Sequence, residues 1–327
     1  MTTSTPLKFI NLPIDSINIA KTYDNFLENH KFLHNYWFVG EINSHQQLED
    51  FIINKILNYG KNRDFPRANG CSQLSPALRW GCITDAQIYW MIHHYHHLAI
   101  LDHNNIWPIP LKPSLPYKDP LVTEPFIRQL GWRNFSYHLL WHYPSMITEN
   151  LKKNFDKFPW VTNNIHLNCW KNGQTGFPIV DAGMRQLIAT GQIPNRVRMI
   201  VASFLTKDLK IHWTEGAKHF WEYLMDADEA NNSASWQWVA GCGMDAAPYF
   251  RIFNPILQSM KFDPQGLYIK QWIPELAKVN YKYIHDPWNY THDIPIKLGQ
   301  DYPTPIVDHS IERQKALEYY KSLSHNE

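Results

Sequence analysis

One stretch of this chain, 226–255, concentrates residue types suited to ligand binding: DADEANNSASWQWVAGCGMDAAPYFRIFNP. Two carboxylates, Asp226 and Asp228, are followed within ten positions by Asn232 and Trp236. Carboxylates accept hydrogen bonds and amides both donate and accept, whereas indoles offer broad apolar faces. The combination predicts a site for a flat aromatic ligand with polar edges.

Four further motifs accompany this stretch: RDFP (63–66), GWRNFSYHLLWHYP (131–144), GQTGFPIVDAGMRQL (173–187) and NRVRMIVASFLTKDLKIHW (195–213). Taken in this order, the five motifs resemble the DNA photolyase and cryptochrome family over about residues 59–310. The resemblance implies a helical domain that binds FAD, a flat flavin with polar edges, and uses light.

Length and composition limit the alternatives. The chain has 327 residues, 44% of them hydrophobic and 19% charged, which is typical of soluble globular proteins with one large domain or two. No apolar run approaches the about 18 residues of a membrane span, and the N-terminus lacks the features of a signal peptide. We therefore expect a cytoplasmic protein, or a nuclear one.

A net charge of +1 gives no overall attraction to DNA, so DNA binding requires a local basic cluster. Such a cluster lies between positions 185 and 210, where one carboxylate accompanies five cations: Arg185, Arg196, Arg198, Lys207 and Lys210. A solvated helix face is the alternative interpretation.

Metal sites are not predicted. The four cysteines form no CxxC pair, which argues against zinc and against an iron–sulfur cluster. His93, His94, His96 and His97 lie close together, but no third ligand or matching carboxylate accompanies them. We interpret them as an exposed or partly buried helix face.

The secondary-structure signals predict an all-α protein with one compact domain. Helices are expected over 84–101, opened by a capping box at Thr84 and Gln87, and over 178–191. Two more are expected over 195–210 and, with Thr214 as N-cap, up to Met225.

The chain is divided into a helical N-terminal extension (1–58), an FAD-binding domain (59–310) and a helical C-terminal end (311–327). The extension holds a helical run over 46–57 and an aromatic patch at 36–38, which covers a surface or belongs to an ordinary core. In the family an antenna domain precedes the flavin domain. We expect that domain and its chromophore to be absent.

A phosphate site is predicted where Ser72, Leu74 and Ser75 precede Pro76, the expected first residue of a helix. Free backbone N–H groups and the helix dipole there favour an anion such as a diphosphate. Where the family has TSRLS this chain has CSQLS, so Gln73 replaces an arginine. A helix N-cap without a ligand is the alternative.

The resemblance assigns further cofactor contacts. Tyr59 binds FAD, and Asp226 and Asp228 contact the sugar chain and the polar edge of the flavin. Asn232 faces flavin N5. Arg198 lies near the ring and pairs with Asp226, although a purely structural Arg–Asp pair is the alternative.

Three tryptophans correspond to an electron relay. The resemblance places Trp236 beside the flavin, Trp213 in the middle and Trp160 at the solvent, so that an electron moves inward to the photoexcited flavin. Trp238 points away from Trp236 on a helix and is assigned to the substrate side. Ordinary core tryptophans are the alternative.

The resemblance also implies a pocket for a flipped-out pyrimidine dimer, whose stacking is already weak. Trp132 stacks on the lesion. The other residues assigned to the pocket or to DNA phosphates are Arg133, Asn195, Arg196, Met199, Arg63 and Lys207.

The lesion type is less sharply indicated. Gln129 stands where cyclobutane-dimer photolyases generally have glutamate and (6-4) photolyases have glutamine. Asn195 and Met199 are the cyclobutane-type residues, and Gln192 replaces a tryptophan often found there. We predict a monomeric photolyase that splits cyclobutane dimers, with single-stranded DNA as a candidate substrate. The alternatives are a (6-4) photolyase, a cryptochrome-like light sensor and one subunit of a split photolyase with a separate antenna subunit.

Overall fold

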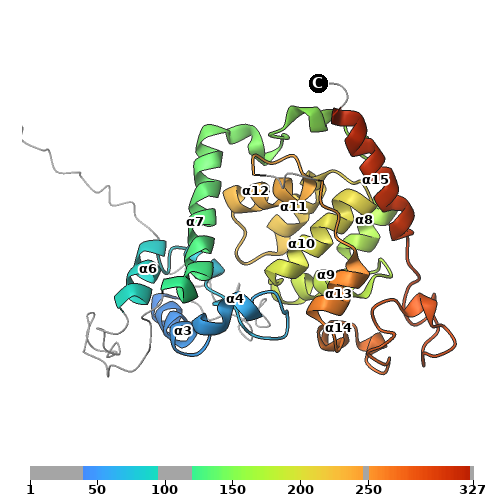
Figure 1. Ribbon diagram of the computed structural model, residues 1–327, viewed down its shortest axis with the longest axis horizontal. Coiled ribbons are helices and arrows are strands. Elements are labelled where there is room, and N and C mark those ends of the chain that lie inside the picture. The colour runs from blue at the N-terminus through green and yellow to red at the C-terminus, as the bar shows by residue number, and fades with distance from the viewer. Residues whose placement is uncertain (1–39, 95–119, 246–249, 325–327) are drawn as a thin grey trace, which may run out of the picture. The chain divides into compact units, whose positions relative to one another are not determined.

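The structure is a computed structural model that describes residues 40–94, 120–245 and 250–324, within a unit that begins at Val39 (Figure 1). These parts of the chain are helical and contain no β-strand, which confirms the predicted all-α class. The first half holds α3 (Glu41–Asn54), η1 (Ile56–Asn58), α4 (Tyr59–Asn62), α5 (Ser75–Arg79), α6 (Asp85–His94), α7 (Pro120–His142), η3 (Pro144–Ile147), η4 (Lys153–Lys157) and α8 (Asn164–Lys171). The second half holds α9 (Pro178–Thr190), α10 (Asn195–Ser203), η5 (Phe204–Asp208), α11 (Trp213–Tyr223), α12 (Glu229–Ala240), α13 (Pro255–Phe262), α14 (Leu267–Trp272), η6 (Pro274–Leu276), η7 (Pro287–Asn289) and α15 (His309–Ser324).

A smaller hydrophobic cluster is built by α3, α4, α6 and the start of α7. Helix α3 contributes Leu48, Phe51 and Ile52, whose spacing places them on one face. The ring of Phe126 on α7 lies 4.5 Å from that of Phe51. Because this cluster also includes Tyr59, the segment before residue 59 packs together with the one after it.

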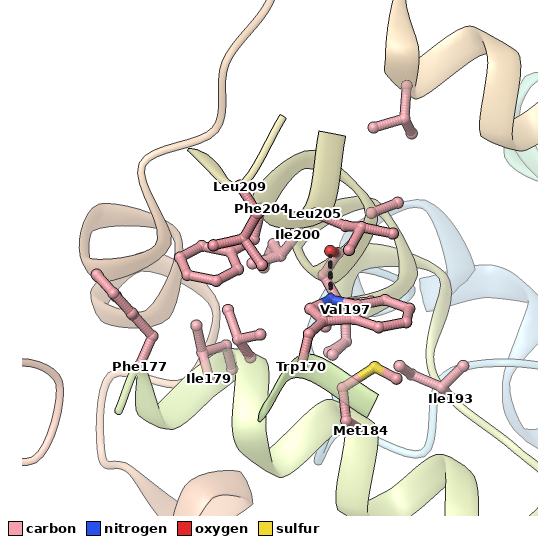
Figure 2. Close-up of a cluster of buried hydrophobic side chains, with 14 of the residues drawn as sticks. Trp170, Phe177, Ile179, Met184, Ile193, Val197, Ile200, Phe204, Leu205 and Leu209 are labelled. Atoms are coloured by element: carbon pink, nitrogen blue, oxygen red, sulfur yellow. Dashed lines mark hydrogen bonds between the residues drawn. The ribbon is translucent and has the colours of Figure 1, made fainter. Parts of the chain in front are cut away.

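The larger cluster is formed by α8 to α12 and the C-terminal elements. Trp170 is fully buried there and donates its indole N–H to the carbonyl of Val201 at 3.0 Å (Figure 2). Helix α9 begins at Pro178 and is followed by Gly191 at φ +66°, as the sequence predicted. Both ends follow from local chemistry, because proline suits a first turn and glycine tolerates the left-handed region.

Some of the predicted helix ends are confirmed and others differ. The capping box at Thr84 and Gln87 is present, with both reciprocal bonds formed (2.8 and 3.1 Å). The predicted cap Thr214 is wrong, since α11 begins at Trp213 and His212 accepts from the Thr214 N–H. The predicted helix 195–210 is α10 followed by the π-helical turn η5, and the residues beyond 94 of the predicted helix 84–101 lie outside the described residues.

Helix α7 links the two clusters. Its first half buries Phe126 and Leu130 in the smaller cluster, and it also packs against α12, which runs beside α11 in the larger one (Figure 1). None of the helices in the described ranges is long and apolar enough to cross a membrane.

Candidate functional site

The segment 226–236 lies where several helices meet. Asp228 is held in place as the N-cap of α12. Its Oδ1 accepts from the backbone N–H and from the side-chain amide of Asn231, both at 2.8 Å. The residue is only 8% exposed. An aspartate at this position also favours the helix through its dipole, so its place is determined by local sequence.

The pair predicted between Arg198 and Asp226 is present. One amino group of the Arg198 guanidinium contacts both carboxylate oxygens of Asp226, at 2.9 and 3.1 Å, while Nε donates to Ile193 O at 2.8 Å. The Asp226 side chain is only 9% exposed and that of Arg198 is 28% exposed. A cation from α10 is therefore held at the start of the segment.

Two residues that the sequence reasoning missed are Arg79 at the end of α5 and Trp80 directly after it, which contact this segment and the residue just before it. Arg79 Nε donates to Ala227 O, and Trp80 Nε1 donates to Met225 O at 2.9 Å. The Arg79 guanidinium also lies over the Trp80 ring, 5.1 Å from its centroid. The only sequence signal was their position one helical turn after the predicted phosphate motif.

Helix α7 contributes Tyr137, which was also missed. Its hydroxyl donates to Asp228 Oδ2, and the Arg133 guanidinium lies 4.9 Å from the centroid of its ring. Burial, and then the bond to Asp228, raises the pKa of Tyr137. Arg133, predicted at the lesion pocket, is thus connected to Asp228, predicted at the cofactor.

Asn232 donates its amide N–H to Ala217 O at 2.9 Å. Reversing the amide would place two oxygens against each other, so this contact fixes the orientation of the group. The oxygen Oδ1 is left as the acceptor for any ligand.

The predicted phosphate motif precedes a single helical turn. Ser75 rather than Pro76 is the first residue of α5, which corrects the predicted start by one position. Ser72 Oγ accepts from Leu74 N at 3.4 Å, and Gln73 has φ +57°. With five residues, α5 has little dipole, so any anion there would depend on individual N–H and hydroxyl groups.

Tyr59, predicted to bind the cofactor, is 7% exposed. Its ring contacts those of Phe51 and Phe126 edge-on, at 5.8 and 5.3 Å. Burial raises its pKa to about 12.

Of the three predicted relay tryptophans, the inner two are buried and the outer one is not. Trp236 and Trp213 are 2% and 0% exposed, whereas Trp160 is half-buried. The ring of His212 contacts both of the outer two, with its centroid 5.0 Å from that of Trp160 and 5.6 Å from that of Trp213. Trp236 has Phe220 at 5.0 Å as a close aromatic neighbour.

Most of the residues predicted to face DNA lie on α7, α10 and α12, whereas Arg63 directly follows α4 and Lys207 lies in η5. Trp132 is 46% exposed, and Gln129 donates to Pro125 O at 3.1 Å. On the first turn of α10, the Asn195 amide lies 3.7 Å from Met199 Sδ. Trp238 is half-buried against the larger cluster.

The predicted basic cluster is not a free cationic surface. Four of its members are paired with carboxylates: Arg185 with Glu275, Arg196 with Asp64, Arg198 with Asp226, and Lys210 with Glu312.

The fifth member, Lys207, is buried, and its predicted phosphate contact is wrong. It is 1% exposed, donates to Ala240 O and lies 3.2 Å from the centroid of the Phe250 ring. The π-helical turn places this side chain inside, and burial lowers its pKa well below the usual value.

Within the described ranges, no three histidine, cysteine, aspartate or glutamate side chains form a group that could hold a metal ion. The ring of His93 lies 4.2 Å from that of Tyr89 and is tilted by 45°, and His96 and His97 lie outside those ranges.

Sequence comparison finds relatives of the chain. Residues 126–322 match the family model described as the FAD binding domain of DNA photolyase. A deoxyribodipyrimidine photo-lyase from Agrobacterium fabrum is 43% identical over 292 residues, which are 88% of this chain and 57% of that protein. The chain thus spans somewhat more than half the length of this relative.

Two solved structures resemble the fold. A bacterial class III photolyase from Agrobacterium tumefaciens superposes with a TM-score of 0.79 and 41% identity, covering 90% of this chain and 58% of that one. The Synechocystis sp. PCC6803 cryptochrome gives a TM-score of 0.76 and 31% identity, covering 87% of this chain and 56% of that one.

Proposed function

We propose that this chain, because it belongs to the family of the FAD-binding domain of DNA photolyase, binds FAD and uses blue light to split cyclobutane pyrimidine dimers in DNA. The observation that carries the proposal is the convergence on segment 226–236. Arg198 from α10, Arg79 from α5 and Tyr137 from α7 all contact it, although they are far apart in the sequence.

The residues at this segment suit a flavin. Arg198 supplies a positive charge to balance a reduced, anionic ring, and Asp228 offers acceptors for hydroxyl groups. The orientation of Asn232 leaves an oxygen to accept, which favours a flavin whose N5 carries a hydrogen. When bound, reduced FAD would supply the electron that opens the cyclobutane ring.

The protein's own contribution is positioning. Trp236 and Trp213 are buried and Trp160 reaches solvent, which suits a path by which electrons enter to restore the reduced cofactor. Trp132 exposes its ring for stacking on a flipped base. Gln129 would donate an amide hydrogen bond to the lesion.

The finer parts of the proposal concern the substrate and partners. Because Arg196 is neutralised by Asp64, charge attraction to duplex phosphates is limited, and stacking on Trp132 would dominate. We therefore propose single-stranded DNA as the preferred substrate. We further propose a monomer without a bound antenna chromophore, unless a separate subunit provides one.

The second candidate is a cryptochrome-like light sensor. Gln129 in place of glutamate favours it, as does the similarity to the Synechocystis cryptochrome. In this case the relay would change the flavin redox state without repair.

The test uses the full chain loaded with FAD and chemically reduced. A UV-damaged single-stranded oligonucleotide is illuminated with blue light, and dimer content is measured by chromatography against a dark control. Light-dependent recovery of the parent oligonucleotide supports the repair enzyme. Bound, photoreducible flavin with persisting dimers would favour the sensor.

The relay is tested on oxidised flavin. Trp236→Phe should abolish photoreduction, whereas Trp221→Phe is the matched control, because Trp221 is 43% exposed on α11 and outside the relay. Equal photoreduction in both variants would argue against the relay.

A further inference from the structure

Tyr137 stands at a junction between α7 and α12. It is 38% exposed, yet its hydroxyl reaches the nearly buried carboxylate of Asp228, 91 positions later in the chain. The same hydroxyl lies 3.3 Å from Arg133 Nη2. One oxygen atom therefore touches a residue predicted to face DNA and a residue predicted to face the cofactor.

The two oxygens of Asp228 have separate partners. Oδ1 caps α12 through Asn231, and Oδ2 accepts from Tyr137. The capping bonds alone would leave the plane of the carboxylate able to turn about its Cβ–Cγ bond. A second donor at Oδ2 fixes that rotation, and hydrogen bonds to a charged acceptor are among the stronger ones.

Arg133 is held by the same arrangement. Its Nη2 donates to Leu78 O at 3.2 Å and to the Tyr137 hydroxyl, and the guanidinium lies over the Tyr137 ring. Leu78 belongs to α5, which also contacts Ala227 through Arg79. Hydrogen bonds thus connect α7, α5 and segment 226–236 to one another.

We propose that Tyr137 is a positioning residue of the FAD site, which orients the Asp228 carboxylate toward the cofactor. This role rests on the proposed function. Tyr137 acts through Asp228, so its effect on cofactor binding should depend on the aspartate being present.

Tyr137→Phe removes the hydroxyl and keeps the ring under Arg133. FAD affinity is measured by quenching of flavin fluorescence for the wild type, Y137F, Asp228→Asn and the double variant. Asn retains helix-capping ability, so D228N changes mainly the charged acceptor. Tyr143→Phe is the matched control, since Tyr143 follows the same helix and is 43% exposed.

We expect Y137F to weaken FAD binding about tenfold, the scale of a hydrogen bond to a charged group. In the D228N background, Y137F should weaken FAD binding less than about threefold, because the carboxylate that accepts from the tyrosine hydroxyl is already altered. Y143F should bind as the wild type does. Thermal unfolding of the flavin-free proteins should differ little, which separates positioning from a general loss of structure.

Wild-type affinity in Y137F, or an equal loss in both backgrounds, would overturn the role of Tyr137 while leaving the proposed function standing. If the wild type itself binds no FAD, the proposed function fails and this role fails with it.

Discussion

The indole of Trp236 lies directly against Gly216 of the neighbouring helix α11. A Cβ atom at position 216 would come within 2.1 Å of Trp236 Cη2. The ring has little room to retreat, because Trp236 is 2% exposed and also contacts the rings of Phe220 and Trp170. Glycine at 216 therefore determines where this indole stands.

Gly216→Ala should destabilise the protein by about 1–3 kcal/mol, the usual cost of overpacking a core. The higher helix propensity of alanine offsets only part of it. Urea unfolding of the flavin-free protein provides the measurement. Gly131→Ala on α7 is the control, since its Cβ would meet nothing within 4 Å and should stabilise slightly. Equal stability of the two variants would contradict the close contact.

Arg198→Met should lower stability by about 2–3 kcal/mol. It leaves the Asp226 carboxylate, 9% exposed, without its cation, and the partial exposure of Arg198 places the loss below the usual 3–5 kcal/mol of a fully buried pair. Adding Asp226→Asn should recover part of the loss.

The control for this pair is Arg185→Met. Arg185 forms a comparable ion pair with Glu275, at 2.8 and 2.9 Å, but away from segment 226–236. Arg185→Met should lower the free energy of unfolding by about 1 kcal/mol at most and leave FAD affinity unchanged. Arg198→Met should weaken FAD binding. If both variants bind FAD equally well, Arg198 is a structural residue only.

His219 should make stability depend on pH. Burial lowers its pKa from 6.5 to about 4, and its Nε2 is buried with no hydrogen-bond partner among the residues that the structure describes. Between pH 4 and pH 6.5 the unfolded chain binds the proton more readily than the folded one. The stability that neutral His219 contributes is therefore complete above pH 6.5 and is lost as the pH falls toward 4. From pH 7 to pH 5 the loss should be about 2 kcal/mol.

The measurement is the free energy of unfolding in urea at both pH values. His219→Phe keeps a ring beside Trp170 and should remove this part of the loss, whereas replacing the exposed His292 with glutamine should retain it. A wild-type pH dependence in His219→Phe would show that other groups cause it.

The sequence was sufficient for features with a local cause. The capping box at Thr84, the end of α9 at Gly191 and the all-α class all follow from short-range chemistry. The Arg198–Asp226 pair was predicted only because a family resemblance connected two distant motifs.

Contacts without a local pattern could not be predicted. Tyr137 reaches Asp228 and Arg79 reaches Ala227 across more than ninety residues, and nothing in the spacing of either pair indicates it. The burial of Lys207 depends on a π-helical turn that ordinary helical periodicity does not reveal. A cation in a sequence is assumed to face solvent until the fold shows otherwise.

Lys207 and Arg63 should therefore differ in their effect on DNA binding. Lys207 is enclosed by Ala240 and Phe250, so Lys207→Met should leave the salt dependence of binding to a single-stranded oligonucleotide unchanged. Replacing a buried amine with an apolar side chain of similar length should also leave stability unchanged or raise it, as for other buried charges.

Arg63 keeps 24% of its side chain exposed. Arg63→Gln should lower the slope of log affinity against log salt by about 0.7, the value for one phosphate contact on single strands. Fluorescence anisotropy over a range of salt concentrations measures both slopes. A lowered slope for Lys207→Met would mean that the buried amine becomes accessible when DNA binds.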